Sequence, residues 1–373
     1  MKSSADKTLL GLDLQELTHI AEQAGEPAYR ARQLFQGLYV DRLGSADEIS
    51  TLPQSFRSWI SGQRFEQGAP AIAQHFASTD CTVRYLMRLS DNETIETVWM
   101  PDGDDGEAGD DSEAGAEIQK QTGGDWKRAT ICVSSQVGCA VNCQFCLTAL
   151  LGVKRNLTAG EIVGQVIAVL NDQNVSPPLE RLNLVFMGMG EPFLNFENFI
   201  KAVRLLVEGV GIPESRMTVS TAGIVPRIYD LGNEGIRPKL AISLTAANDD
   251  LRSRLMPINR KWNLKHLITA AQEFPLRNRE KITFEYVLMR GVNDSDQDAR
   301  EVAELVRGVK AKINLIALNP GPRIEFETPD EKRLNDFQQI LIRAGIPTFI
   351  RRPRGRDIYA ACGQLKRTME ATT

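Results

Sequence analysis

This 373-residue chain has few histidines, and it lacks long apolar runs and a leader-like segment. Its three histidines, His19, His75 and His266, stand far apart in the sequence, so a zinc site that combines cysteine with histidine has few ligands to draw on. No run comes near the roughly 18 apolar residues that a membrane helix needs. The N-terminal segment also lacks the uninterrupted apolar core and the small-residue cleavage site of a signal peptide. We therefore expect a cytoplasmic protein without a membrane partner.

The net charge of the chain depends on one short segment. Hydrophobic residues make up 42% of the chain and charged residues 25%, which is typical of a globular protein. The formal net charge is −4, but residues 102–117 contain eight acidic residues and no basic one. The rest of the chain, with 44 basic and 40 acidic residues, carries a net charge of +4. This mild positive charge is compatible with a nucleic-acid partner and does not establish one.

Changes in sequence pattern divide the chain into four parts. Helical periodicity and capping residues predict a helical accessory domain over 1–70, and period-two alternation predicts a β extension over 71–101. The acidic, glycine-rich stretch 102–127 cannot form a core and is interpreted as a flexible insertion. An acidic loop that mimics nucleic acid is the alternative interpretation of this stretch.

Strands and helices alternate over the last part, residues 128–373. Alternation of this kind predicts an α/β fold with a parallel sheet covered by helices, either doubly wound or a barrel. Six main strands are predicted, which is few for a closed eight-stranded barrel. Polar residues and glycines follow most of the strand ends, and ligands bind at the carboxyl ends of strands in such folds.

Three of the six cysteines fall within eight residues, as Cys139, Cys143 and Cys146 with the spacing C-x-x-x-C-x-x-C. A tight group in a reducing compartment indicates metal binding or catalysis rather than disulfides. Structural zinc prefers four ligands, and an extended chain would put Cys132 roughly 23 Å away. A 4Fe-4S cluster with three cysteine ligands leaves one iron open for an exogenous ligand. Zinc with a distant fourth ligand, or cysteines grouped by chance, are the alternatives.

The cysteine motif, placed directly after the first predicted strand, resembles that of the radical S-adenosylmethionine (SAM) enzymes. In that superfamily the amino and carboxylate groups of SAM chelate the open iron. The stretch "MGMGEP" at 187–192 is similar to the glycine-rich element that follows the second strand there and contacts the methionine amino group. The two motifs, in this order, are specific together, whereas "GEP" alone would be ordinary loop sequence.

A narrower resemblance covers nearly the whole chain. The segments "RATICVSSQVGCAVNCQFC", "GMGEPFLN", "AISLTAANDDLRSRLMPIN" and "RGRDIYAACGQL" resemble the RlmN/Cfr family of radical SAM RNA methyltransferases. The resemblance implies a partial (β/α)6 TIM-type barrel with a small helical N-terminal accessory domain and a short β extension. It also implies one 4Fe-4S cluster per chain, SAM as cofactor, and a reductant such as flavodoxin or ferredoxin. The implied substrates are 23S rRNA and tRNA, methylated at adenine C2 by a monomeric enzyme.

Adenine C2 is not nucleophilic, so it cannot attack the methyl group of SAM directly. The family chemistry therefore uses two further cysteines. The resemblance makes Cys362 the carrier of a methyl group, whose carbon, after hydrogen abstraction, adds to the adenine. Cys132 then resolves the protein–RNA crosslink by forming a disulfide, and Glu96 accepts the ring proton. The cluster ligands are Cys139, Cys143 and Cys146. For SAM, the matching positions are Gly190, Glu191, Ser220, Ser243, Leu244, Thr245 and Asn319.

Several positions keep a second interpretation. Relatives often have histidine where Thr245 stands, which weakens a side-chain role there and leaves backbone contacts. Cys81 matches no family role and is interpreted as structural. Arginines before Cys362 suit phosphate contact, although a solvated surface would look the same. These arginines are Arg351, Arg352, Arg354 and Arg356, and Lys154 and Arg155 are weaker candidates of the same kind.

Two further functions remain open on the sequence. The Cfr type methylates C8 of the same ribosomal adenine and shares every catalytic residue named above. A catalytically inactive, metal-containing RNA-binding protein is the non-enzymatic alternative. Intact Cys132, Cys362 and Glu96 argue against it, since a mere binder needs none of the three.

Overall fold

The computed structural model describes residues 7–101, 126, 128–175 and 181–365. The insertion expected at 102–127 lies outside these residues except for Trp126. None of the helices within the described ranges combines the length and the apolar character that crossing a membrane demands.

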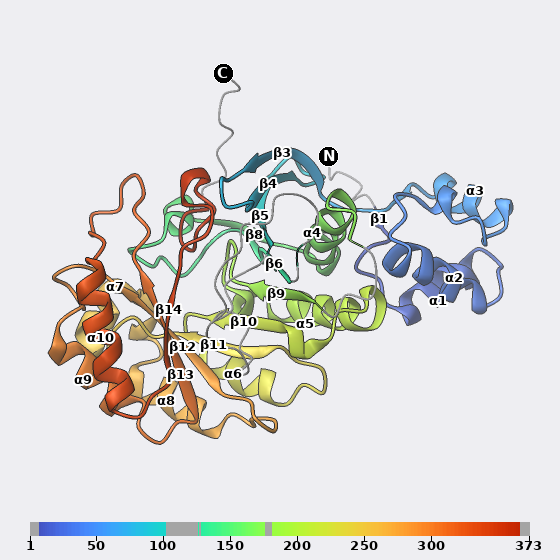
Figure 1. Cartoon of the computed structure of the whole chain (residues 1–373). Coiled ribbons are helices and arrows are strands. Elements are labelled where there is room, and N and C mark those ends of the chain that lie inside the picture. The colour runs from blue at the N-terminus through green and yellow to red at the C-terminus, as the bar shows by residue number, and fades with distance from the viewer. Residues whose placement is uncertain (1–6, 102–125, 127, 176–180, 366–373) are drawn as a thin grey trace.

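One ten-stranded sheet runs through the described part of the molecule, in the order β14-β13-β12-β11-β10-β9-β6-β5-β4-β3 (Figure 1). Neighbouring strands from β14 to β6 pair in parallel, and those from β6 to β3 pair antiparallel. The parallel strands are β6 (Ala129–Cys132), β9 (Leu182–Phe186), β10 (Met217–Thr221), β11 (Lys239–Ser243), β12 (Ile282–Leu288), β13 (Ala311–Ala317) and β14 (Thr348–Arg351). The antiparallel strands are β3 (Ala71–Ala77), β4 (Val83–Arg88) and β5 (Thr94–Pro101).

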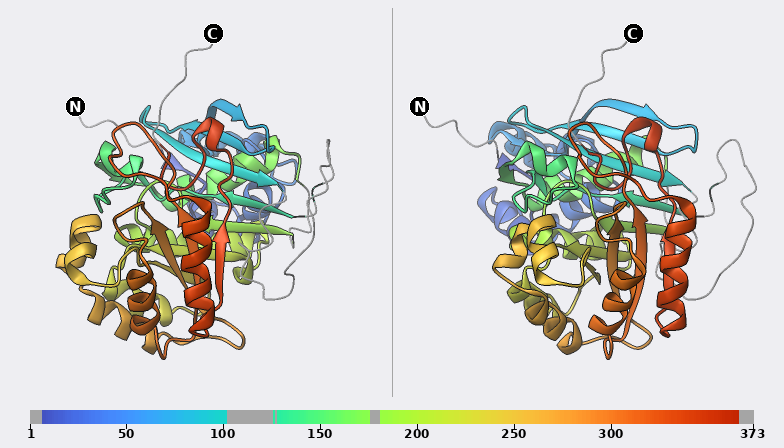
Figure 2. Two further views of the ribbon diagram at one scale, coloured as in Figure 1. Left: turned by 60° about the vertical axis from the view of Figure 1, so that its left-hand side comes forward. Right: turned by 90° about the vertical axis from the view of Figure 1, so that its left-hand side faces the viewer.

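Helices alternate with the parallel strands, as the sequence pattern predicts. They are α4 (Ala159–Asp172), α5 (Phe196–Leu205), α6 (Val225–Gly232), α7 (Asp249–Leu255), α8 (Leu264–Glu273), α9 (Asp296–Leu305) and α10 (Glu331–Arg343). Figure 2 shows α10 lying along β13 and β14 with α9 beside it. Reciprocal capping boxes start α4 and α9, at Thr158 with Glu161 and at Ser295 with Asp298, because each pair satisfies two backbone N–H groups that the helix leaves open. The expected α/β fold class is confirmed, and β14 adds a strand to the six main ones predicted.

The N-terminal helices lie at the end of the molecule away from α9 and α10 (Figure 1). They are α1 (Leu14–Gln23), α2 (Tyr29–Phe35) and α3 (Gln54–Gly62), and a short β1 (Lys7–Thr8) pairs with β2 (Phe65–Glu66). A Cβ on Gly11 would lie 2.6 Å from the backbone nitrogen of Gly160, so this segment sits directly against the start of α4. One buried core extends from these helices into the sheet. Because this core is shared, it does not test the domain boundaries at residues 70, 101 and 127, which stay a prediction.

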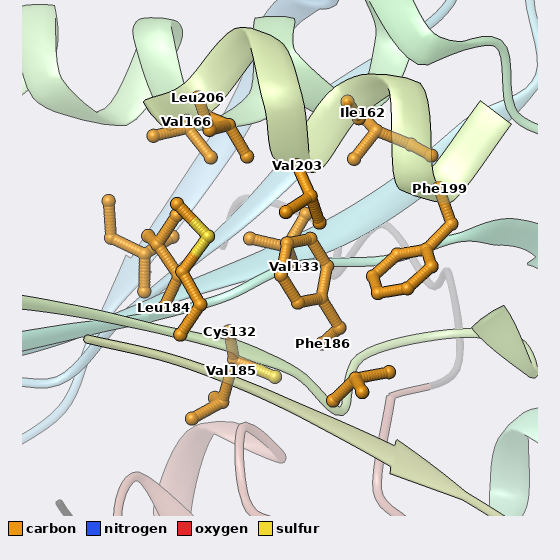
Figure 3. Close-up of a cluster of buried hydrophobic side chains, with 14 of the residues drawn as sticks. Cys132, Val133, Ile162, Val166, Leu184, Val185, Phe186, Phe199, Val203 and Leu206 are labelled. Atoms are coloured by element: carbon orange, nitrogen blue, oxygen red, sulfur yellow. The ribbon is translucent and has the colours of Figure 1, made fainter. Parts of the chain in front are cut away.

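Part of this core lies between the sheet and the helices α4 and α5. Figure 3 shows Cys132 at the end of β6 beside Val185 of β9, below apolar side chains such as Ile162 and Val203. All residues of β6 and β9 are buried, which fits strands covered on both faces. The first strand thus carries Cys132 to the boundary between the apolar core and the carboxyl edge of the sheet.

Candidate active site

Two adjoining cavities open at the carboxyl edge of the parallel strands. The first, here named the cysteine cavity, is lined by Cys139, Cys143, Cys146, Gly190, Glu191, Ser220, Ser243, Glu285, Asn319 and Cys362, among others. The second, the arginine cavity, is lined by Cys132, Cys362, Arg351, Arg352 and Arg354, among others. Cys146, Asn319 and Cys362 line both cavities. The tertiary structure therefore gathers most of the predicted site residues around one joined space.

The three clustered cysteines lie in the loop that joins two antiparallel strands, β7 (Gln136–Gly138) and β8 (Val153–Asn156). Gly138 has a φ of 85°, and a Cβ there would lie 1.8 Å from the carbonyl oxygen of Gly152, so only glycine fits. The backbone N–H of Cys139 donates to the same carbonyl at 3.0 Å. The hairpin thereby fixes where the cysteine loop leaves the sheet.

The environment of the three thiols disfavours free thiolates, so anionic sulfur there needs a cationic partner. Burial above all, together with the charges of Cys146 and Glu191, raises the pKa of the Cys139 thiol to about 12. Burial also raises the pKa of Cys143 and of Cys146. Metal binding needs the thiolates and supplies the positive charge that offsets this cost. In the described ranges, no three His, Cys, Asp or Glu side chains converge closely enough to hold a single ion. Cysteines placed around a cavity suit a larger four-iron cluster better than one zinc.

Glu191 ties the loop after β9 to the end of β10. Its Oε2 accepts from the Ala222 N–H at 2.7 Å, and its Oε1 accepts from the Phe193 N–H at 3.1 Å. Burial raises the pKa of Glu191 to about 7. A Cβ on the preceding Gly190, whose φ is 99°, would lie 2.7 Å from the backbone nitrogen of Gln136. Close packing against Gln136 therefore explains the glycine of the "GEP" turn, and the same turn lines the cysteine cavity.

Polar side chains at the next strand ends also face the cysteine cavity. Ser220 Oγ donates to Glu285 Oε2 at 3.0 Å and lies 3.5 Å from Ser243 Oγ. Asn319 Nδ2 donates to the carbonyl of Cys362 at 3.1 Å, whereas its buried Oδ1 has no hydrogen-bond partner among the described residues. A buried acceptor left open on a cavity wall indicates a ligand that donates to it. This fits a cofactor with amino and hydroxyl groups, as SAM has.

Leu244 and Thr245 lie behind the cavity wall in the described structure. Both are fully buried, and Thr245 adopts a φ of 58°. Asn293 Nδ2 donates to the Thr245 carbonyl at 2.8 Å, and the Leu244 N–H donates to the Glu285 carbonyl at 2.8 Å. Their backbone thus joins neighbouring segments at the rim, and neither residue is among those that line the two cavities.

Cys132 and Cys362 line the same cavity although 230 residues separate them in the chain. Cys132 is 9% exposed at the end of β6, and Cys362 is exposed in the segment after β14. Glu96 lies on β5, two residues before Val98, which pairs with Cys132 across the sheet. Its carboxylate is fully buried and forms an ion pair with Arg84. Glu96 is therefore near the arginine cavity without being among the residues that line it.

The arginines before Cys362 differ in their surroundings. Arg351 is 8% exposed and pairs with Glu285 at 2.8 Å, and Arg354 Nη2 donates to the carbonyls of Asp80 and Pro101. Arg352 lines the arginine cavity, while Arg356 is exposed outside it. Of the two weaker candidates, Lys154 pairs with Glu93 and Arg155 with Asp91 and Glu161. Internal ion pairs thus account for several of the predicted phosphate ligands.

Sequence reasoning missed Glu285 and Arg252. Glu285 is a buried acidic residue in the apolar strand "ITFEYVLM", a pattern that by itself signals a functional or paired carboxylate. Arg252 is fully buried in α7 beside the cysteine loop. Its position in a polar helical segment gave no such signal.

Comparison with known proteins gives consistent results. The profile of the Radical SAM superfamily matches residues 133–306. A probable dual-specificity RNA methyltransferase RlmN from Koribacter versatilis is 64% identical over 93% of this chain and 98% of its own length. A dual-specificity RNA methyltransferase RlmN from a Nitratiruptor species is 40% identical over 98% of this chain and 99% of its own. The crystal structure of a radical SAM methyltransferase from Sphaerobacter thermophilus superimposes with a TM-score of 0.86 at 41% identity, covering 97% of this chain and all of that one.

Proposed function

This chain belongs to the RlmN family of radical SAM RNA methyltransferases, and on this premise we propose that it methylates adenine C2 in 23S rRNA and in tRNA next to the anticodon. The observation that carries the proposal is the position of Cys362. It lines the cavity of the three clustered cysteines and also the cavity that contains Cys132. A single side chain can therefore meet the cofactor on one side and the substrate on the other.

Membership in the Radical SAM superfamily implies a 4Fe-4S cluster and SAM. We propose that Cys139, Cys143 and Cys146 hold one cluster per chain. When bound, the cluster and SAM supply the reductive cleavage that starts radical chemistry. The residues proposed to hold SAM are Gly190, Glu191, Ser220, Ser243 and Asn319, with the backbone of Leu244 and Thr245 shaping the rim.

The protein's own residues then divide the work at the substrate. Cys362 carries a methyl group on sulfur, and after loss of one hydrogen that carbon bonds to adenine C2. Glu96 accepts the ring proton as the adduct gives up one electron, which would return to the bound cluster. The Cys132 thiolate then bonds to the Cys362 sulfur, the sulfur–carbon bond to the RNA breaks, and the carbon left on adenine takes up a proton to become the methyl group. The proton transfer requires the buried Glu96 carboxylate to reach the arginine cavity, which changes its contact with Arg84. The shared cavity of Cys132 and Cys362 supports the disulfide step.

RNA recognition is proposed for the arginine cavity. Arg352 is the exposed arginine on its wall, and a guanidinium group binds phosphate bidentately. Arg351 and Arg354, which internal partners hold, add positive charge to the same wall. The proposed enzyme acts as a monomer and takes its electrons from a small carrier such as flavodoxin or ferredoxin. We also propose that the chain divides into a helical accessory domain, a β extension, an acidic insertion and a radical SAM core, at 1–70, 71–101, 102–127 and 128–373.

The test is an anaerobic reaction followed by nucleoside analysis. Protein reconstituted with iron and sulfide is incubated with SAM, a chemical one-electron reductant and either a 23S rRNA fragment or tRNA, and the digested RNA is analysed by mass spectrometry. We expect 2-methyladenine from both RNAs. Finding 8-methyladenine without 2-methyladenine would establish the Cfr-type reaction instead. A colourless protein with stoichiometric zinc that forms no 5′-deoxyadenosine would establish an inactive RNA-binding protein.

A further inference from the structure

Arg252 is a fully buried arginine that binds only neutral oxygen atoms. Its Nη2 donates to the carbonyls of Ala222 at 2.8 Å and Ser243 at 2.9 Å. Its Nε donates to the carbonyl of Leu244 at 3.1 Å, and its Nη1 donates to Asn259 Oδ1 at 2.9 Å. The guanidinium group therefore joins the carboxyl ends of β10 and β11, where the polar side chains of the cysteine cavity begin.

The charge of Arg252 is not balanced in the way that other buried arginines are. Arg84, Arg237 and Arg351 are also buried, and each faces a carboxylate, from Glu96, Glu280 and Glu285 respectively. In the described part of the chain, Arg252 has no carboxylate within ion-pair distance. Burial lowers its pKa to about 10, which leaves the group positively charged at neutral pH. A buried charge is costly unless an opposite charge compensates it.

Two acidic groups act on Arg252 at longer range, Cys143 in the cysteine loop and Asp249 at the start of α7. Asp249 reaches the guanidinium only through Asn259, whose Nδ2 donates to Asp249 Oδ1 at 2.9 Å. The cysteine loop is joined to the helix directly, because the backbone N–H of Gln144 donates to the Leu255 carbonyl at the end of α7 at 2.9 Å. Met256, which follows that helix, lines the cysteine cavity. The helix that carries Arg252 is thus hydrogen-bonded to the residue next to a proposed cluster ligand.

We propose that Arg252 is the fixed counter-cation of the iron–sulfur site and stabilises the reduced cluster. This inference rests on the proposed function, since it assumes that Cys143 is a cluster ligand. A cluster bound by thiolates is anionic, and one electron from an external reductant adds a further negative charge. A buried cation nearby stabilises the more negative form more strongly, because the interaction grows with the charge product in a medium of low dielectric constant. Cluster potentials respond to net charge and burial in this way.

The backbone contacts of Arg252 give it a second, positioning role. The Ala222 peptide donates its N–H to Glu191 at 2.7 Å and offers its carbonyl to Arg252 at 2.8 Å. A Cβ on Gly223 would lie 3.4 Å from Arg252 Nη2, so the segment is closely packed on the guanidinium. Loss of the side chain would therefore affect the position of Glu191, and the test must separate position from charge.

The experiment is an anaerobic redox titration of the reconstituted protein, followed by electron paramagnetic resonance of the reduced cluster. Arg252→Gln removes the charge, Arg252→Lys keeps it with fewer hydrogen bonds, and Arg254→Gln removes an exposed charge from the same helix as the matched control. We expect Arg252→Gln to reduce the equilibrium constant for cluster reduction about tenfold, which is about 59 mV for one electron. Arg252→Lys and Arg254→Gln should titrate close to the unsubstituted protein.

Each outcome decides the matter. An Arg252→Gln protein that loads its cluster and keeps the original midpoint potential overturns the proposal while leaving the cluster site intact. If Arg252→Gln purifies without iron, the iron content of Arg252→Lys distinguishes charge from position. Iron in the lysine variant supports a role for the positive charge, and a lysine variant equally without iron shows that only the hydrogen bonds of Arg252 matter. An unsubstituted protein that assembles no cluster contradicts the proposed function itself.

Discussion

Thr148, two residues after the last clustered cysteine, donates a hydrogen bond from Oγ1 to the carbonyl of Leu365, three residues after Cys362, at 2.9 Å. Thr148 is 3% exposed, so water does not replace this bond readily. The backbone also joins the two segments, because the N–H of Leu147 donates to the Gly363 carbonyl at 2.8 Å. The loop of the proposed cluster ligands and the segment of the proposed methyl carrier therefore form one hydrogen-bonded unit.

Replacing Thr148 with valine should loosen the segment that carries Cys362. The change removes the donor and keeps the shape, and one intramolecular hydrogen bond contributes about 1 kcal/mol to stability. We expect faster hydrogen–deuterium exchange in the peptide covering 360–365. Thr148→Ser, which keeps the hydroxyl, is the control and should exchange at close to the original rate. Equal exchange in the valine variant would show that the bond does not hold the segment.

Gly138→Ala should damage the cysteine loop far more than Gly152→Ala. Both glycines have positive φ, and Gly152 combines a φ of 64° with a ψ of −178°, so alanine is strained at either position by about 1–3 kcal/mol. A Cβ on Gly138 would also meet the Gly152 carbonyl oxygen at 1.8 Å, whereas a Cβ on Gly152 has nothing within 4 Å. We expect the Gly138 variant to lose bound iron after reconstitution and the Gly152 variant to keep most of it. Iron and sulfide assays measure the difference, and similar iron contents would contradict the steric argument.

Acid should remove the stabilisation that Asp80 provides. Burial alone would raise the pKa of Asp80, but hydrogen bonds from the Gly355 N–H at 2.9 Å and from Thr82 hold it below its ordinary value. The contribution is therefore present in full above the unfolded pKa of about 4 and is lost as the pH falls through the lower folded pKa. We expect the unfolding free energy of Asp80→Asn to fall below that of the unsubstituted protein at pH 7. Urea unfolding at a series of pH values should show this gap closing in acid, and a gap that stays constant would rule out the charge as its cause.

Glu285→Gln should destabilise the protein, since it removes the negative charge opposite buried Arg351. Breaking a buried pair by neutralising one partner costs about 3–5 kcal/mol, and both side chains are less than 10% exposed. Glu327→Gln provides the contrast, because the Arg290–Glu327 pair is largely exposed and should contribute little. Chemical denaturation of both variants measures the two losses. Equal small losses would mean that the Glu285–Arg351 pair does not stabilise the wall between the cavities.

Replacing Cys132 and replacing Cys362 should have different effects on the reaction with RNA. If Cys362 carries the methyl group and Cys132 resolves the crosslink, Cys132→Ala should retain a covalent RNA adduct and Cys362→Ala should form none. Denaturing gel electrophoresis with labelled RNA distinguishes them. Cys81→Ala is the control and should release methylated RNA normally, because Cys81 is an exposed residue in the β3–β4 turn. An adduct in the Cys362 variant would show that another residue is the carrier.

The candidate site could be predicted from the sequence where one short segment carries the chemistry. The spacing of Cys139, Cys143 and Cys146 and the glycine of "GEP" are local features, and alternating strand and helix patterns put both at the same edge of the sheet. Leu244 and Thr245 show the limit of this reasoning. Their position at a strand end was predictable, but the full burial of both residues was not, because burial depends on packing against distant segments.

What the sequence by itself determined is the order of the elements and the close spacing of the three clustered cysteines, because periodicity, caps and cysteine spacing act over a few residues. Only the tertiary structure decided which distant residues meet. Sheet order brings Cys132 on β6 and Cys362 after β14 to one cavity, pairs Glu285 with Arg351, and puts Arg252 against the ends of two strands. These contacts join residues up to 230 positions apart, and burial in a common low-dielectric interior gives them their strength.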